Sequence, residues 1–199
     1  TRWQWTSDLT EWRISNNQVS IHNKSGTTFL NAGFKNTSVV MELPESHAAF
    51  CSQAAEFSSW VLEILQVKRI ERIGLRIIQI AKRKHFKLLL SKMRENLLGL
   101  TDDDWVILGG HPEDIGIPLT LVLDEYRANF TLGPMRAEQL VDFFEAKEVK
   151  GKLPAVALFL DFDLYKNDPD FSPETYREKF ENFLKSGNQQ ILDISSRFV

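Results

Sequence analysis

Residues 67–81 read VKRIERIGLRIIQIA, and this stretch constrains the fold more than any other part of the chain. It contains five isoleucines, and β-branched side chains favour strands. Successive side chains of a strand point to opposite faces, so one face is charged and the other is apolar. The charged face comprises Lys68, Arg72, Gly74 and Arg76, and the apolar face comprises Ile73, Leu75 and Ile77. We therefore predict a long strand whose apolar face packs in the core and whose other face carries cations.

Residues 155–165 form the second most strand-like stretch of the chain. One of its faces is wholly apolar and consists of Val156, Leu158, Leu160, Phe162 and Leu164. The other face brings Asp161 and Asp163 together, because residues two apart on a strand share a face with side chains ~7 Å apart. A buried strand with two carboxylates on its second face is therefore predicted.

Hydrophobic periodicity and turn signals predict the remaining elements. Further strands are expected at residues 2–6, 12–15, 18–22, 28–31, 39–43, 105–108 and 119–132. Helices are expected at residues 46–66, 85–98 and 136–147 and from Ser172 onward, with Ser46 as a cap, Gly99 as a stop and Gly187 as an interruption. Strands and helices interleave without regular βαβ spacing, which indicates an α+β fold with a mostly antiparallel twisted sheet and helices packed on one face. The 199 residues are expected to form a single domain, or two similar halves at residues 1–100 and 101–199.

The composition argues against several classes of protein. A net charge of −3 disfavours a protein built mainly to bind nucleic acid, which needs a basic surface. No apolar run approaches the ~18–20 residues of a membrane helix, so no membrane partner is predicted. Cys51 is the only cysteine, so no internal disulfide can form and a reducing, cytoplasmic location is expected. We interpret its thiol as a buried apolar group rather than a nucleophile, because the sequence offers no paired histidine.

Three short motifs give the chain a family resemblance. They are Trp3-Gln4-Trp5-Thr6, Arg72-Ile73-Gly74-Leu75-Arg76-Ile77-Ile78-Gln79 and Leu160-Asp161-Phe162-Asp163-Leu164-Tyr165. Their order and spacing resemble a family of uncharacterised, sporadically distributed prokaryotic proteins that carries W-Q-F-T, R-I-G-L-R-Y-I-N and L-D-I-D-V-Y at the corresponding places. Ile77 stands where that family has an aromatic residue, and Gln79 stands where it has asparagine. The resemblance covers most of the chain and implies no activity, because the family has no established one.

Charged residues on three predicted strands form the candidate site. Its members are Arg72, Arg76, Glu125, Arg127, Asp161 and Asp163, with Asp124 as an alternative to Glu125. If these strands are neighbours, the group forms either an ion-pair network without a function of its own or a functional site. In one functional form, Arg72 and Arg76 are a guanidinium fork for an anionic ligand or a partner's carboxylate. In the other, Asp161 and Asp163 bind a divalent cation for phosphoryl chemistry, together with a third carboxylate.

A basic turn, Lys82-Arg83-Lys84-His85, follows the first strand described above. Four such residues can form a patch for anions or nucleic acid, but at a surface turn they are more often a solvated connection between two elements. We interpret this turn as a solvated connection.

The sequence contains no catalytic motif. Its four histidines never occur at metal-binding spacing, and it has no nucleophile elbow, dinucleotide fingerprint or phosphate loop. No cofactor is therefore predicted. The leading hypothesis is a cytoplasmic protein that binds a protein partner or a small anionic ligand, with a homodimer as a third form. The competing hypothesis is a metal-dependent enzyme that acts on phosphate esters through Asp161 and Asp163, so the sequence leaves enzymatic activity open.

Overall fold

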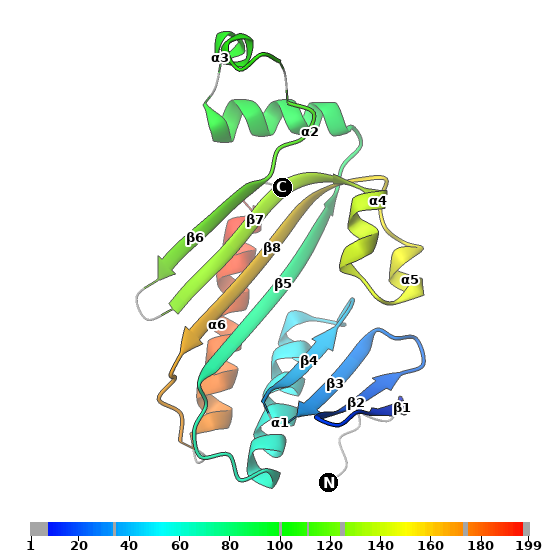
Figure 1. Cartoon of the computed structure of the whole chain (residues 1–199), viewed down its shortest axis with the longest axis vertical. Coiled ribbons are helices and arrows are strands. Elements are labelled where there is room, and N and C mark those ends of the chain that lie inside the picture. Colours follow the sequence, from blue (N-terminus) through cyan, green and yellow to red (C-terminus); the bar gives the residue numbers. More distant parts are fainter. Residues whose placement is uncertain are drawn as a thin grey trace. The chain divides into compact units, whose positions relative to one another are not determined.

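In a computed structural model, the chain folds into two four-stranded antiparallel sheets and six α-helices among the residues that the structure describes (Figure 1). These are residues 8–33, 35–99, 101–110, 112–123, 126–172 and 175–196. The predicted α+β class with antiparallel, twisted sheets is confirmed. The strands are divided between two sheets.

The first sheet has the strand order β1-β2-β3-β4, and the second has the order β5-β8-β7-β6. The strands are β1 (Leu9–Ile14), β2 (Gln18–Asn23), β3 (Thr28–Gly33), β4 (Thr37–Met41), β5 (Arg72–Lys82), β6 (Ile117–Leu123), β7 (Tyr126–Arg136) and β8 (Val156–Asn167). The α-helices are α1 (His47–Ile64), α2 (Phe86–Met93), α3 (Asp102–Ile107), α4 (Ala137–Leu140), α5 (Lys147–Lys150) and α6 (Tyr176–Ser196). A π-helical turn, η2 (Arg94–Leu98), continues α2, and a 3-10 turn, η3 (Val141–Phe143), continues α4.

The chain divides into two compact units, each assembled from separate stretches of sequence. The first unit holds the first sheet, α1, α5 and most of α6, from residues up to 73, 144–152 and 167–192. The second unit holds nearly all of the second sheet with α2, α3 and α4, from residues 74–143, 153–166 and those from 193.

In the first unit, α1 packs against one face of the first sheet (Figure 1). The helix begins after Ser46, whose hydroxyl accepts the backbone N–H of Ala49 at 3.0 Å. Phe57 and Val61 lie four residues apart on the same helix face and are buried with Leu30 of β3. The predicted cap of this helix is confirmed.

In the second unit, β8 is a central strand with β5 on one side and β7 on the other. Leu160 and Phe162 on one of its faces are fully buried. The opposite face is apolar only at one end, where Phe159 is buried with Leu140 of α4 and its ring centroid lies 4.5 Å from that of Phe143. Polar side chains take over this face further along β8, beginning at Asp161.

The strand predicted over residues 67–81 begins later than expected. The chain leaves α1 through Gln66, which has a positive φ of 50°, and stays irregular up to residue 70. Lys68 therefore lies outside β5, which corrects the prediction. Within β5 the predicted alternation is confirmed, with Ile73 and Leu75 buried between exposed neighbours.

Residues 105–108 were predicted as a strand, but residues 105–107 belong to α3. Thr101 and Asp104 form a capping box at its start. The Thr101 hydroxyl accepts the Asp104 N–H at 3.4 Å, and the Asp104 carboxylate accepts the Thr101 N–H at 2.7 Å. A short apolar run has no strong period of its own, so the cap decides in favour of a helix.

The single strand predicted over residues 119–132 is a hairpin of β6 and β7, in which Leu123 pairs with Tyr126. Apolar alternation runs through both strands, and no glycine or proline marks the reversal between them. Asp124 and Glu125, at the reversal, lie outside the described residues. The predicted strand at residues 2–6, with the first motif of the family resemblance, also lies outside them.

Two predicted helices have different bounds. The helix expected at residues 136–147 ends with η3 at Phe143, and α5 begins separately at Lys147. The interruption expected at Gly187 is absent, because α6 continues through it. A glycine inside a helix costs only ~1 kcal/mol relative to alanine, so packing can override it. Gly99, in contrast, ends η2 in the left-handed conformation (φ 61°), as predicted.

Cys51 lies in α1 with 1% of its surface exposed. Burial raises the pKa of its thiol above the ordinary value, and the nearby charge of Lys185 opposes this shift. A thiol that is buried and protonated is a poor nucleophile, so the structure agrees with the interpretation of Cys51 as a buried apolar group.

Candidate functional site

Three neighbouring strands of the second sheet place the predicted site residues on one face. Asp161 and Asp163 of β8 pair with Thr131 and Asn129 of β7, and Tyr165 pairs with Arg127. Directly paired residues share a face of the sheet. We call this surface the polar strand face, and it comprises Gly74, Arg76, Arg127, Asn129, Thr131, Asp161, Asp163 and Tyr165. Arg72, at the start of β5, belongs to the first unit. Glu125, the remaining predicted member of the site, lies outside the described residues.

The polar strand face is held together by a bidentate ion pair between β5 and β8. Arg76 donates from Nε to Asp161 Oδ1 at 2.9 Å and from Nη2 to Asp161 Oδ2 at 2.7 Å. These hydrogen bonds raise the pKa of Arg76, and the charges of Asp161 and Asp163 add to the effect. The guanidinium edge that an external anion would use is therefore occupied by Asp161.

The same ion pair argues against a metal ion bound by Asp161 and Asp163. Both oxygens of Asp161 accept hydrogen bonds from a cation, which competes with a metal ion for the carboxylate. Within the described part of the chain, no group of three or more His, Cys, Asp or Glu side chains is arranged to hold a metal ion. No feature of the described residues therefore favours metal-dependent chemistry at this face.

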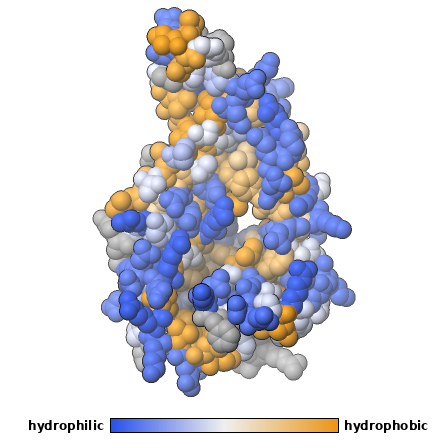
Figure 2. Space-filling model, viewed as in Figure 1, coloured by the Kyte–Doolittle hydropathy of each residue, from blue (hydrophilic) through white to orange (hydrophobic). Residues whose placement is uncertain are grey.

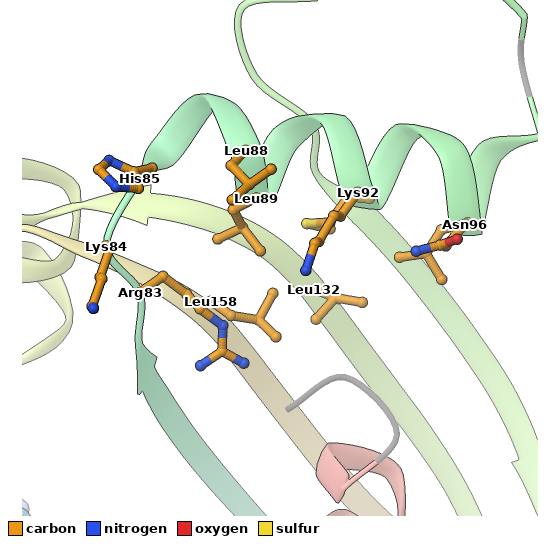
Figure 3. Close-up of a pocket in the computed structure, with 11 residues that line it drawn as sticks. Arg83, Lys84, His85, Leu88, Leu89, Lys92, Asn96, Leu132 and Leu158 are labelled. Carbon is orange, nitrogen blue, oxygen red and sulfur yellow. The ribbon is translucent and has the colours of Figure 1, made fainter.

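A cavity of about 580 Å³ lies in the second unit, between α2 with η2 and the strands below them (Figure 3). We call it the cationic cavity. Its lining residues are Arg83, Lys84, His85, Leu88, Leu89, Lys92, Met93, Asn96, Leu97, Leu132 and Leu158. None of these described lining residues is acidic.

Two cations reach into the cationic cavity from different elements. Figure 3 shows the Arg83 guanidinium, from the turn after β5, and the Lys92 ammonium, from α2, both extending into the space beside Leu158 and Leu132. Arg83 also donates from Nη1 to the carbonyl of Lys82 at 2.9 Å. Lys92 forms no ion pair with a carboxylate among the residues that the structure describes. Lys92 therefore contributes a positive charge to the cavity that no described carboxylate neutralises.

The local sequence explains how these side chains come to face one another. Arg83 directly follows β5, and its backbone N–H donates to the Val156 carbonyl at 2.9 Å, which anchors the turn to β8. At the start of α2, the Phe86 ring is buried with the Arg136 guanidinium 3.6 Å from its centroid. Leu89, in the next turn of α2, is buried as well. These contacts hold α2 over the sheet.

The π-helical turn η2 extends the wall of the cationic cavity beyond α2. It contributes Asn96 and Leu97 to the lining. π-helical turns are rare, and they occur frequently at functional sites. This feature was not predicted, because the sequence pattern of α2 and η2 reads as one continuous helix.

The comparisons with known proteins add no functional information. No protein family, curated protein or solved structure matches this chain. The family resemblance drawn from the three short motifs therefore stays a prediction. Among the described residues, no helix is both long and apolar enough to cross a membrane.

A second cavity, of about 540 Å³, lies in the first unit and has mixed charge. Its lining includes both carboxylates and cations, namely Glu56, Glu63, Lys68, Arg69 and Arg177. Arg69 is paired with Asp168 at 2.7 Å. Because charges of both signs line this cavity, it selects an anion less strongly than the cationic cavity does.

The basic turn at residues 82–85 connects β5 to α2, and Lys82, Lys84 and His85 are exposed to solvent, in agreement with a solvated connection. Arg83, Lys84 and His85 also line the cationic cavity. The sequence signal was present in the quartet itself, but the apolar floor and Lys92 were needed to recognise a site. Leu132 and Leu158 come from β7 and β8, far from the turn in sequence, so their proximity follows only from the fold.

Proposed function

We propose that this protein binds a small organic anion and that the cationic cavity holds it. The observation that carries the proposal is the Lys92 ammonium, which extends into a 580 Å³ cavity whose described lining contains no carboxylate. Cavities of ~300–1,000 Å³ are typical of small-molecule sites. The volume thus fits a small ligand, and the positive charge of the lining favours a ligand with negative charge.

The Lys92 ammonium suits an acid group, because it is a compact point charge with three N–H donors. The Arg83 guanidinium, which already donates to the Lys82 carbonyl, adds positive charge beside it. Apolar walls lower the local dielectric constant and so strengthen the attraction. The polar strand face is a weaker candidate, because Arg76 already binds Asp161.

The proposal is tested by calorimetric titration with phenyl phosphate, a compact organic anion. Lys92→Met should weaken binding about tenfold or more, since a hydrogen bond to a charged group contributes ~1.5–3 kcal/mol. Lys87→Met is the matched control, because Lys87 is an exposed lysine of α2 that does not line the cavity. Its affinity should stay within about twofold of the original chain.

Two results would contradict this proposal. Undetectable binding of phenyl phosphate and other organic anions to the original chain would remove the function. Equal loss of binding in Lys87→Met and Lys92→Met would show only a general charge effect. A third variant, Arg76→Met, checks the location: strong loss of binding in this variant alone would return the site to the polar strand face.

A further inference from the structure

We infer that two copies of this chain pair through β6, so that two four-stranded sheets join across a twofold axis into one sheet of eight strands. This inference goes beyond the proposed function and does not depend on it, because no residue of β6 lines the cationic cavity. It follows from the place of β6 in its sheet, from its lack of charge and from the position of its proline.

β6 is an edge strand without the charges that usually guard such a position. It ends the strand order β5-β8-β7-β6 and pairs with β7 on one side (Figure 1). An edge strand presents unpaired N–H and C=O groups, which proteins commonly protect with charged side chains or bulges. The seven residues of β6, IPLTLVL, include no charged side chain, and their register with β7 is continuous. Two of them are exposed large apolar side chains, Leu119 at 46% and Val122 at 74%.

The other described edges differ from β6. β5, the opposite edge of the second sheet, carries three basic residues. β1 carries Glu11 and Arg13, and its register with β2 is irregular. β4 has five residues, and the carboxylate of Glu42 at its end accepts the backbone N–H groups of Glu145 at 2.7 Å and Ala146 at 3.1 Å. Among the described edges, β6 is therefore the one best suited to the addition of a strand.

Pro118 shows which residues of β6 face the free edge. Proline has no backbone N–H, so within a sheet it occupies positions whose N–H would point away from the neighbouring strand. Pro118 pairs with Thr131 inside the ladder of β6 and β7, so its nitrogen faces the free edge. Residues two apart on a strand direct their backbone groups the same way. Thr120 and Val122 therefore present both N–H and C=O to an added strand.

A second copy of β6 matches this pattern. Antiparallel pairing centred on Thr120 places the Thr120 residues of the two copies opposite each other, and it places Val122 of each copy opposite Pro118 of the other. The two Thr120 residues then exchange N–H···O=C bonds, and each Val122 N–H donates to a Pro118 carbonyl. Every N–H that Thr120 and Val122 direct outward thus finds an acceptor, and the missing N–H of proline leaves no donor unpaired.

The same register keeps both faces of the joined sheet continuous. Leu119 pairs with Phe130 of β7, which is buried, and Leu121 shares this face. Thr120 lies on the opposite, polar strand face, where its hydroxyl donates to Asn129 Oδ1 at 3.4 Å. In the proposed pair, Leu119 of one copy lies opposite Leu121 of the other. The pairing therefore covers exposed apolar surface and brings no charged side chain of β6 against the partner.

The first experiment measures the dissociation constant of the dimer by sedimentation equilibrium. Val122→Lys should raise this constant about tenfold or more, because it replaces an apolar contact at the paired edge by a charge. Val106→Lys is the matched control, because Val106 is also 74% exposed but lies in α3, where orange atoms gather at one end of the molecule in Figure 2. Its dissociation constant should stay within about twofold of that of the original chain.

The second experiment tests the twofold register through a reversal of charge at Thr120. Thr120→Lys and Thr120→Glu each place two like charges opposite each other, so each variant alone should sediment as a monomer. An equimolar mixture should pair again, because a lysine then faces a glutamate, and added salt should weaken this mixed dimer. Recovery of the dimer in the mixture also shows that both variants are folded.

Three results would contradict the inference. An original chain that stays monomeric at every concentration it tolerates in solution would overturn it. Loss of the dimer in Val106→Lys that equals or exceeds the loss in Val122→Lys would assign the association to other exposed apolar surface. A mixture of the two Thr120 variants that is as monomeric as its components would overturn the twofold pairing of β6.

Discussion

Asp161 occupies the Arg76 guanidinium and so removes it as a site for an external anion. Asp161 has 17% of its side chain exposed, whereas Arg76 has 57% exposed. Exposed ion pairs contribute only ~0.2–1 kcal/mol, but bidentate geometry is the favourable case among them. The pair therefore stabilises the contact of β5 with β8 and leaves Arg76 little capacity for an external anion.

At this scale we predict the effect of Arg76→Met on stability. The free energy of unfolding, measured by urea denaturation, should fall by about 1 kcal/mol, because Asp161 loses a bidentate partner while largely shielded from water. Arg127→Met is the control, since Arg127 is exposed on the same polar strand face. Its effect should be close to zero. A double-mutant cycle of Arg76 and Asp161 that gives no coupling would contradict the ion pair.

At the scale of elements, α3 shows a helix that depends on its cap. It has only six residues, and short helices are marginal without outside support. Hydrogen bonds from the hydroxyl and the backbone N–H of Thr101 lower the pKa of Asp104 below its ordinary value of 3.8. The carboxylate form of Asp104 is therefore the form that caps the helix.

This shift predicts that α3 loses stability in acid. A carboxyl group with a lowered pKa in the folded state contributes stability above its unfolded pKa and loses it as the pH falls through the folded pKa. Hydrogen-exchange protection of the Leu108 amide, which donates to the Asp104 carbonyl at 3.0 Å, should fall below about pH 4 after correction for intrinsic rates. In Asp104→Asn the protection should be weaker and no longer depend on pH in this range. The amides of α1 serve as an internal control, because that helix has no acidic residue in its first turn.

At the scale of the whole molecule, two compact units are built from interleaved stretches of one chain. The described lining of the cationic cavity belongs to the second unit, namely to the turn after β5 and to α2, η2, β7 and β8. A ligand that binds only the folded state stabilises it by RT ln(1 + [L]/Kd), about 2.7 kcal/mol at one hundred times Kd. Because the cavity lies in the second unit, a bound ligand should stabilise this unit in particular.

We therefore predict that phenyl phosphate protects the second unit from hydrogen exchange. At saturation, amides of α2 and of the adjoining ends of β7 and β8 should exchange more slowly, and Lys92→Met should abolish the change. Amides of the first sheet serve as the comparison, because none of its residues lines the cavity. Protection centred on the first sheet, with none in α2, would contradict binding in the cationic cavity.

Local features of the sequence predicted much of the fold but less of the candidate site. The alternation around Arg76, the strand that carries Asp161 and the cap at Ser46 were all recognisable, because each depends on residues within a few positions. The strand predicted at residues 105–108 was wrong, since a short apolar run fits either structure until its cap is known. The hairpin of β6 and β7 was missed because no turn residue marks it.

The sequence by itself determined the α+β class, the two faces of β5 and β8, and the presence of a basic turn after β5. Only the tertiary structure decided that Arg76 meets Asp161, 85 residues away, and that Lys92 and Arg83 share a cavity floored by Leu132 and Leu158. The physical reason is the distance along the sequence over which each kind of interaction acts. Backbone preferences and side-chain alternation act over a few residues, whereas the pairing of distant strands and the seating of α2 depend on which apolar surfaces bury one another.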